Sequence, residues 1–246
     1  MESKKSHELP SHLSGTLPMG WVDHHPISQF ELGSGRNFVY LLLDWSAPFG
    51  SRSAAIVDPQ SDVEEILHLL KLNGFLLTHI LLTHTHYDHV AGVPPLLNKI
   101  PDLAILVGDA DLHRLSRTVR DSGRIQAIQQ KHEFQLGGIR IVAHPTPGHS
   151  AGGICFFLEQ QPEVGVDRPF LFTGDLVFIR DCGRTDFPDG SDAQMFDSIQ
   201  KIKSFPDDTV LLVGHHYAPE CATTLGKELL ESPPFLCETV EDLARL

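Results

Sequence analysis

Four apolar segments of this chain each lead into a histidine or an aspartate, and this arrangement limits the folds that the chain can adopt. Short apolar runs predict buried strands, and α/β proteins gather their functional side chains at one edge of a sheet, beyond the strand ends. We therefore expect the four segments to converge on one site. The segments are residues 79–83, 139–143, 170–173 and 210–213, which lead to His84, His149, Asp175 and His215.

The first of these segments is followed by a dense cluster of potential metal ligands. Residues 83–89 read Thr-His-Thr-His-Tyr-Asp-His, so three imidazoles and one carboxylate follow an apolar strand directly. Imidazole nitrogens and carboxylate oxygens bind first-row divalent ions, and such bulky polar side chains have no packing reason to end a buried strand. The segment predicts a metal site. The alternative interpretation is a polar loop in a histidine-rich protein.

Further strands and helices alternate along the chain. Ser61 with Glu64 has the spacing of a capping box and predicts a helix over about 62–72, and Ser191 with Gln194 predicts the start of another. Because strands this apolar need cover on both faces, the predicted fold class is a layered α/β domain. The other expected elements are strands at 38–43, 54–57, 104–107 and 154–158, a helix from about Asp109, and a hairpin turning at Gly137-Gly138.

Composition and charge limit the partners and the cellular locations that we expect for this protein. The net charge of −13 disfavours a nucleic-acid partner, because binding phosphates requires clustered Lys and Arg. The four cysteines show no Cys-x-x-Cys spacing, which favours a reducing compartment. The N-terminus lacks the apolar segment of a secretory signal, and the longest apolar run, Phe38–Leu43, is too short to cross a bilayer. We expect a cytoplasmic protein with a small-molecule substrate and without a membrane partner.

The ligand segments together resemble the metallo-β-lactamase superfamily. The signature of that family is similar to Thr-His-x-His-x-Asp-His, then Pro-Gly-His, Gly-Asp and Gly-His, and all of these occur here in order. The resemblance implies an αββα sandwich, a four-layer fold, with the site at one edge. It also implies one metal site made by His84, His86 and His149, a second made by Asp88, His89 and His215, and Asp175 as a bridge.

Within the superfamily, the chain most resembles the glyoxalase II-like hydrolases. The supporting stretches are 172–178, 182–187, 206–209 and 214–217. The resemblance implies two divalent ions, Zn²⁺ first and Fe or Mn as alternatives, and a metal-bound hydroxide that cleaves an ester or a thioester of glutathione or another small thiol. Asp88 and Asp175 are the expected catalytic residues, because they would orient the attacking water. The short stretch after His215 leaves little chain for the C-terminal helical domain of true glyoxalase II enzymes.

Two other functions are compatible with the same residues. Residues 179–187 also resemble persulfide dioxygenases, which would use a single Fe²⁺ held by His84, His149 and Asp175 to oxidise glutathione persulfide. Those enzymes typically have Ala at the position of Tyr87. The third hypothesis is a non-catalytic metal-binding module, which we disfavour because all seven ligand positions are filled.

Several residues near the signature have less specific interpretations. Arg184 is expected either to pair with Asp186 or to bind a substrate carboxylate, and Tyr217 to donate a hydrogen bond to the substrate. Cys182 is interpreted as a small, half-buried residue. The histidines outside the strand-then-ligand pattern are expected at the surface or in loops, namely His24, His25, His132, His144 and His216.

The sequence predicts one catalytic domain over residues 27–246. Residues 1–26 are rich in Pro, Ser and His and show no periodicity, so we interpret them as a partly irregular N-terminal extension. A length of 246 residues suits one large domain, and it leaves a homodimer open.

Overall fold

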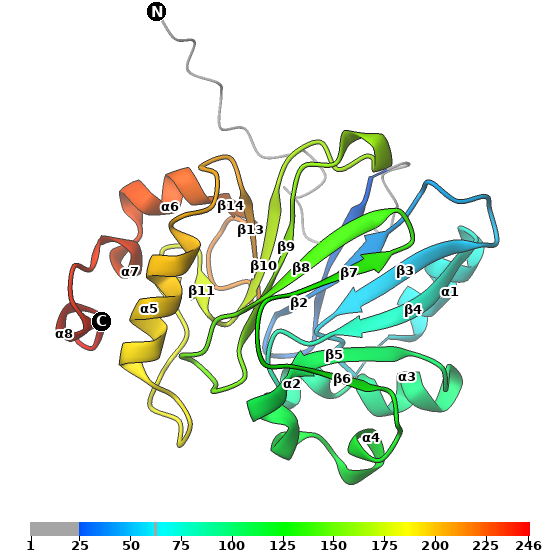
Figure 1. Cartoon of the computed structure of the whole chain (residues 1–246), viewed down its shortest axis with the longest axis horizontal. Coiled ribbons are helices and arrows are strands. Elements are labelled where there is room, and N and C mark those ends of the chain that lie inside the picture. The colour runs from blue at the N-terminus through cyan, green and yellow to red at the C-terminus, as the bar shows by residue number, and fades with distance from the viewer. Residues whose placement is uncertain (1–24, 62) are drawn as a thin grey trace, which may run out of the picture.

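Two six-stranded sheets pack face to face, with helices on the outer side of each sheet (Figure 1). The structure is a computed structural model, and it describes residues 25–61 and 63–246. The four layers confirm the expected αββα sandwich. Most of the expected N-terminal extension and His24 lie outside the described residues.

The first sheet has the strand order β1-β2-β3-β4-β5-β6. The pairs β1–β2 and β2–β3 are antiparallel, and the pairs from β3 to β6 are parallel. This arrangement brings the ends of β3 and β4 to the same edge. The strands are β1 (Ile27–Leu32), β2 (Asn37–Leu43), β3 (Arg52–Val57), β4 (Phe75–Leu81), β5 (Ala104–Gly108) and β6 (Ile125–Ile128).

The second sheet has the order β14-β13-β10-β9-β8-β7, in which β10 and β13 are parallel neighbours. A separate two-stranded ribbon follows β10. The strands of the sheet are β7 (His132–Leu136), β8 (Ile139–Pro145), β9 (Ile154–Leu158), β10 (Phe170–Gly174), β13 (Val210–Val213) and β14 (Thr223–Thr224), and those of the ribbon are β11 (Val177–Phe178) and β12 (Asp181–Cys182).

The helices divide between the two outer faces (Figure 1). Within the described residues, none of them is both long and apolar enough to span a bilayer. The first group is α1 (Glu64–Leu72), α2 (Tyr87–Val90), α3 (Val93–Lys99), the 3₁₀ helix Asp109–Arg114 and α4 (Arg117–Arg120). The second group is α5 (Asp192–Ile202), α6 (Leu225–Glu231), α7 (Pro233–Leu236) and α8 (Val240–Leu243), and a 3₁₀ turn at Pro162–Val164 lies between β9 and β10.

The core has three apolar parts, one between the sheets and one under each helical layer. Phe156, Phe170 and Phe172 are fully buried between the sheets. On the outer side of the second sheet, Met195 and Ile199 of α5 pack on Leu171 of β10. Because both faces of each sheet are covered, the continuous apolar runs seen in the sequence become buried strands.

Most local predictions are confirmed, and one helix start is wrong. Strands β2, β3, β5 and β9, the hairpin β7–β8 and the cap of α5 by Ser191 lie where expected. Helix α1, however, begins at Glu64 rather than 62, and its N-cap is Val63, without a side-chain cap. The Ser61 hydroxyl instead donates to the side chain of Gln60, so the spacing of the capping box was coincidental.

Two further expectations are corrected. The helix expected from Asp109 is a 3₁₀ helix over Asp109–Arg114, followed by the separate α4. His144 and His216, expected at the surface or in loops, are buried. His144 is part of β8 and faces Phe157 and Phe205, and His216 stacks on Phe38 with 5.0 Å between ring centroids.

Candidate metal centre

The four strand-then-ligand segments meet at one end of the sandwich. Because β10 and β13 are parallel, Gly174-Asp175 and Gly214-His215 leave the sheet side by side, and the Gly214 amide donates to the Gly174 carbonyl at 2.9 Å. The two sheets also join here, since Ile154 donates its amide to the carbonyl of Thr83 at 2.7 Å. The expected convergence is therefore observed.

Glycines precede three of the candidate ligands, and at Gly174 and Gly214 the surroundings leave no room for a side chain. Gly174 has φ = 50°, a left-handed conformation that L side chains rarely adopt, and it lies against the side chain of Thr83. A Cβ on Gly214 would overlap Asp175 Oδ1 and lie 3.0 Å from the Gly174 carbonyl carbon. The small residues in the sequence pattern thus allow Asp175 and His215 to lie next to each other.

The histidine-rich segment and the loop after β8 supply a first group of three ligand types. Helix α2 starts at Tyr87, so His84 and His86 lie in the extended stretch between β4 and that helix. One nitrogen each of His84, His86 and His149 lies within 4.8 Å of the others. His84 and His149 are buried, and His86 is half-buried.

A second group of three lies beside the first, again within 4.8 Å, and consists of Asp88, His89 and His215. Asp175 lies between the two groups. Its Oδ2 is 3.6 Å from His149 Nε2 on one side and 3.3 Å from His215 Nε2 on the other. Its Oδ1 is 3.4 Å from His89 Nε2. The geometry therefore offers two triads of nitrogen and oxygen donors with one carboxylate in common.

The donor set fits divalent metal ions. His84 Nε2 and Asp175 Oδ1 are buried without a hydrogen-bond partner among the described residues, although buried polar atoms are normally paired. Both atoms belong to the cluster, and imidazole with carboxylate is a donor set that suits zinc, iron or manganese. A cation at each triad would satisfy these otherwise unpaired atoms.

Asp58, at the end of β3, orients two members of the cluster, and the sequence pattern did not identify it. Its Oδ1 accepts the Thr83 amide at 2.7 Å, and its Oδ2 accepts from Thr83 Oγ1 and from His89 Nδ1, the latter at 3.1 Å. Because Nδ1 of His89 faces this carboxylate, Nε2 is the ring nitrogen that faces Asp175 and His215. Asp58 also has φ = 49°, an uncommon value for a residue other than glycine.

Asn37, at the start of β2, is the second residue that the sequence did not reveal. It is fully buried, and its Nδ2 donates to Asp88 Oδ2 at 2.8 Å. The neighbouring turn carbonyl, Gly35 O, accepts from His215 Nδ1 at 2.8 Å and so fixes that ring as well. Strand β2 therefore contributes to the cluster through its first residue, and not through a side chain that follows its last residue.

His215 and His216 face different surroundings, as expected for neighbours at a strand end. His215 belongs to the cluster, whereas His216 Nδ1 lies next to the carboxylate of Glu31, with the Arg36 guanidinium 2.8 Å away. The His216 amide also donates to the Arg36 carbonyl at 2.9 Å. His216 thus stabilises the turn around Gly35 and Arg36, whose Gly35 carbonyl accepts from His215 Nδ1.

Burial and neighbouring charges separate the histidines into two kinds. Burial, with the proximity of other imidazoles, lowers the pKa of His84, His86 and His149 below the usual 6.5, so these rings present lone pairs at neutral pH. Burial opposes the charged form of His89 too, but the carboxylates of Asp175 and Asp58 outweigh it and raise the pKa of His89 well above the usual value. The same contacts hold the pKa of Asp175 well below 3.8 despite its burial.

The two residues expected to bind substrate lie near the cluster in different ways. The Arg184 guanidinium pairs with both carboxylate oxygens of Asp186, at 2.8 and 2.7 Å, so the expected ion pair is present. The Arg184 carbonyl accepts from His149 Nδ1 at 2.7 Å. Tyr217 is exposed, and its ring stacks on His215 with centroids 4.7 Å apart.

Cys182 is half-buried, as expected.

This sandwich, with a cluster of histidine and aspartate at one edge, defines a metalloprotein of the αββα class. The sequence pattern of the Metallo-beta-lactamase superfamily matches residues 37–215, and the chain belongs to this superfamily. It is 35% identical over 181 residues to a hydroxyacylglutathione hydrolase of a Synechococcus species, a match that covers 74% of this chain and 65% of the relative. A hydroxyacylglutathione hydrolase of Prochlorococcus marinus is 34% identical over 68% of this chain and 62% of its own length. The chain thus spans less than two thirds of the length of either relative.

Solved structures share the fold. A crystal structure of ETHE1 from Myxococcus xanthus superimposes with a TM-score of 0.74 and 24% identity, covering 89% of this chain and 88% of that one. A structure of TTHA1623 in a di-iron-bound form has a TM-score of 0.64 and 27% identity, over 83% of this chain and 98% of that one. The first comparison extends the fold assignment to nearly the whole chain.

Proposed function

We propose that this chain is a metal-dependent hydrolase of the glyoxalase II-like type, which cleaves a thioester or an ester of a small molecule. The observation that carries the proposal is the pair of three-ligand groups with Asp175 between them. The relative named hydroxyacylglutathione hydrolase supports the thioester as the bond that is cleaved. We further propose that residues 27–246 form the catalytic domain.

Each residue of the cluster has a role under this proposal. His84, His86 and His149 would hold one divalent ion, Asp88, His89 and His215 would hold a second, and Asp175 lies between the two groups. Zn²⁺ is the first candidate, and Fe and Mn are alternatives. Such a pair of ions supplies a water acidified to near neutral pH and polarises the carbonyl that is attacked.

Other groups position the reacting molecules. Asp88 and Asp175 accept hydrogen bonds from the attacking water and direct its lone pair toward the carbonyl carbon. Asn37, which donates to Asp88 Oδ2, holds that carboxylate in place. Tyr217 lies flat on His215 at the exposed side of the cluster, where its hydroxyl can donate to the bound substrate.

For Arg184 we propose a role in ordering its loop, rather than the substrate contact that its residue type suggested. Its Nε and Nη2 donate to the two carboxylate oxygens of Asp186, and its guanidinium lies 5.1 Å from the centroid of the Phe187 ring. Phe187 in turn contacts the rings of His86 and His149, with centroids 4.8 and 5.4 Å away. We propose that Arg184 orders this loop, and that its carbonyl orients His149.

A persulfide dioxygenase is the second candidate, because His84, His149 and Asp175 alone form a two-histidine, one-carboxylate set. His84 Nε2 and His149 Nε2 lie 3.9 and 3.6 Å from Asp175 Oδ2. Such a set suits a single ferrous ion with open positions for oxygen and a sulfur ligand. In that reaction His89 and His215 would not be direct ligands.

Two assays on the same preparation separate these functions. The hydrolase proposal expects release of free thiol from a hydroxyacylglutathione thioester, without oxygen consumption. The dioxygenase expects oxygen uptake with glutathione persulfide and little thioester cleavage. Oxygen uptake that persists in His215→Ala, with no thioester hydrolysis in the parent protein, would overturn the hydrolase proposal.

A further inference from the structure

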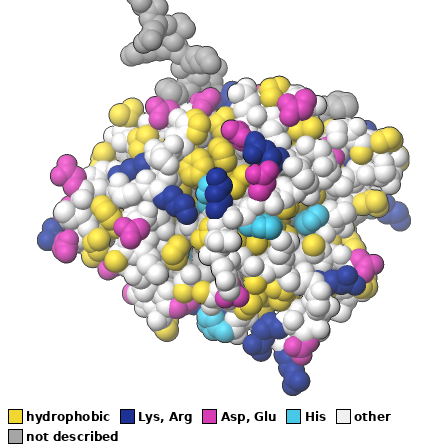
Figure 2. Space-filling model, in the orientation of Figure 1, with side chains coloured by type: hydrophobic (Ala, Val, Ile, Leu, Met, Phe, Trp, Pro, Cys, Tyr) yellow, Lys and Arg dark blue, Asp and Glu magenta, His cyan; other side chains and the backbone are white. Residues whose placement is uncertain are grey.

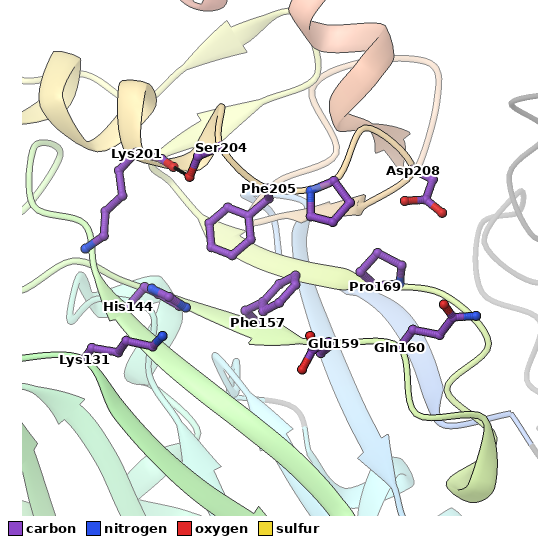
Figure 3. A pocket seen from close by; sticks show the side chains of 11 residues that line it. Lys131, His144, Phe157, Glu159, Gln160, Pro169, Lys201, Ser204, Phe205 and Asp208 are labelled. Carbon is purple, nitrogen blue, oxygen red and sulfur yellow. Dashed lines mark hydrogen bonds between the residues drawn. The ribbon is translucent and has the colours of Figure 1, made fainter.

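A cavity opens on the outer face of the second sheet, away from the metal ligands. It has a volume of about 710 Å³, which falls within the usual range of small-molecule sites, and the seven candidate metal ligands do not line it. Its walls come from β8, β9 and the C-terminal end of α5 (Figure 3). In Figure 2, basic and hydrophobic side chains lie together on the face that carries these strands.

The centre of this cavity is aromatic. The Phe157 and Phe205 rings lie 4.5 Å apart, and the His144 ring meets Phe205 edge-on at 5.2 Å. Pro169 and Pro206 also line the cavity and extend its apolar surface. Rings in this arrangement offer a flat apolar ligand both face and edge contacts.

Two lysines stand at one end of the cavity, on either side of His144 (Figure 3). Neither Lys131 nor Lys201 forms an ion pair with a carboxylate of the described residues. Lys201 Nζ donates instead to the Pro145 carbonyl at 2.8 Å, which fixes the ammonium near the cavity. Both lysines are exposed, and in a protein with 32 acidic and 19 basic residues such unpaired neighbouring cations attract an anion.

His144 adds a polar group without adding charge. Burial, together with Lys201 and Lys131, lowers the pKa of His144 from 6.5 to about 4, so the ring is neutral at pH 7. The opposite end of the cavity is acidic, because Glu159 and Asp208 line it. Glu159 is paired with Arg140, whereas Asp208 has no ion-pair partner among the described residues. A second negative charge on a ligand would therefore be unfavourable at that end.

We propose that this cavity is a second ligand site, which takes a small monocarboxylate with a flat aromatic body. The carboxylate lies between Lys131 and Lys201, and the aromatic body packs on Phe157 and Phe205. The distribution of charge along the cavity fixes the orientation of the ligand. The site is separate from the metal centre, so it does not depend on the reaction catalysed there.

Calorimetric titration of the full-length, metal-loaded protein with naphthalene-1-carboxylate tests this proposal. We expect saturable binding, and at least about tenfold weaker binding of the uncharged naphthalene-1-carboxamide. Lys131→Met should weaken carboxylate binding about threefold, and the double variant Lys131→Met/Lys201→Met about tenfold, as for exposed ion pairs. Lys71→Met is the matched control, because Lys71 is an exposed lysine on α1, and it should bind as the parent protein does.

The Lys131 single variant keeps the test valid if the double variant folds poorly, since Lys131 is exposed and has no hydrogen-bond or ion-pair partner among the described residues. Asp175→Ala locates the binding. Naphthalene-1-carboxylate should bind that variant with the parent affinity. Equal affinity for carboxylate and carboxamide, no saturation up to ~10 mM, or binding that is lost in Asp175→Ala but unchanged in the lysine variants would each overturn the proposal.

Discussion

Replacing Asp58 by Asn tests how the buried carboxylate controls the second ligand group. In the parent protein, Asp58 Oδ2 accepts the Nδ1–H of His89 at 3.1 Å. An amide nitrogen at that position donates instead, and the proton of His89 must then move to Nε2, the atom that faces Asp175 and His215. That tautomer has no lone pair for a cation.

The size of the effect follows from the role of Asp58 as a supporting contact. Loss of the hydrogen-bond partner that orients a metal-binding histidine usually lowers metal affinity 10- to 100-fold, or about 1.4–2.8 kcal/mol. Because His89 belongs to the second group, we expect Asp58→Asn to weaken the second of two binding events and to change the first much less. Equilibrium dialysis of metal-free protein against Zn²⁺, with elemental analysis, measures both events.

Asp44→Asn is the matched control for a general loss of stability. Asp44 is also buried after a strand, and it accepts from the Ser46 amide, the Ser46 hydroxyl and the Gly138 amide at 3.0, 2.6 and 2.9 Å. It follows β2 at the end opposite Asn37, roughly 20 Å along the strand. Asp44→Asn should lower the free energy of unfolding and leave Zn²⁺ binding unchanged. The role assigned to Asp58 is refuted if folded Asp58→Asn binds the second ion within twofold of the parent affinity.

Three further predictions concern packing, pH and thiol reactivity. Gly214→Ala places a Cβ against Asp175 Oδ1, so metal content measured by elemental analysis should fall while the far-ultraviolet circular dichroism stays that of the folded parent; full metal content would contradict this. The pKa of His144 is lowered to about 4, so the unfolded chain takes up a proton below pH 6.5 that the folded protein does not, and the free energy of unfolding should decrease as the pH falls from 6.5 to 4. In urea titrations, the free energy of unfolding of His144→Gln should decrease less between pH 6.5 and 4 than that of the parent protein. An equal decrease would show that His144 does not cause this pH dependence. Burial raises the pKa of Cys155 and of Cys182 to about 12, so in native protein at pH 8 both should react with iodoacetamide much more slowly than after denaturation, as followed by mass spectrometry; rapid native labelling of Cys182 would indicate an activated thiol instead.

The sequence revealed those parts of the site that are local in the chain. An apolar strand is followed within a few positions by a ligand residue at three places, residues 83–89, Gly174-Asp175 and Gly214-His215. Their convergence at one edge of a sheet could therefore be expected from this pattern along the chain. The αββα architecture followed from the same ordered motifs through the family resemblance. These predictions required no knowledge of which side chains pair.

The sequence pattern could not predict side-chain contacts between strands that lie far apart in the chain. Asp58 follows β3 and Asn37 begins β2, and neither lies near a histidine in the chain; each acquires its role only when its strand end meets the cluster. The same reason explains His216, whose partner Glu31 lies on β1. For Ser61 the error was of another kind, because its hydroxyl donates to Gln60 Oε1 and the helix begins only at Glu64, with Val63 as its N-cap.

The most direct test of the metal centre is the number of ions bound per chain. Protein purified without added metal, and its His215→Ala variant, would be analysed for bound metal against protein concentration. Because Asp175 lies between two complete three-ligand groups, we predict two divalent ions in the parent protein and one in His215→Ala. One ion per chain in the parent, unchanged in His215→Ala, would contradict the dinuclear centre.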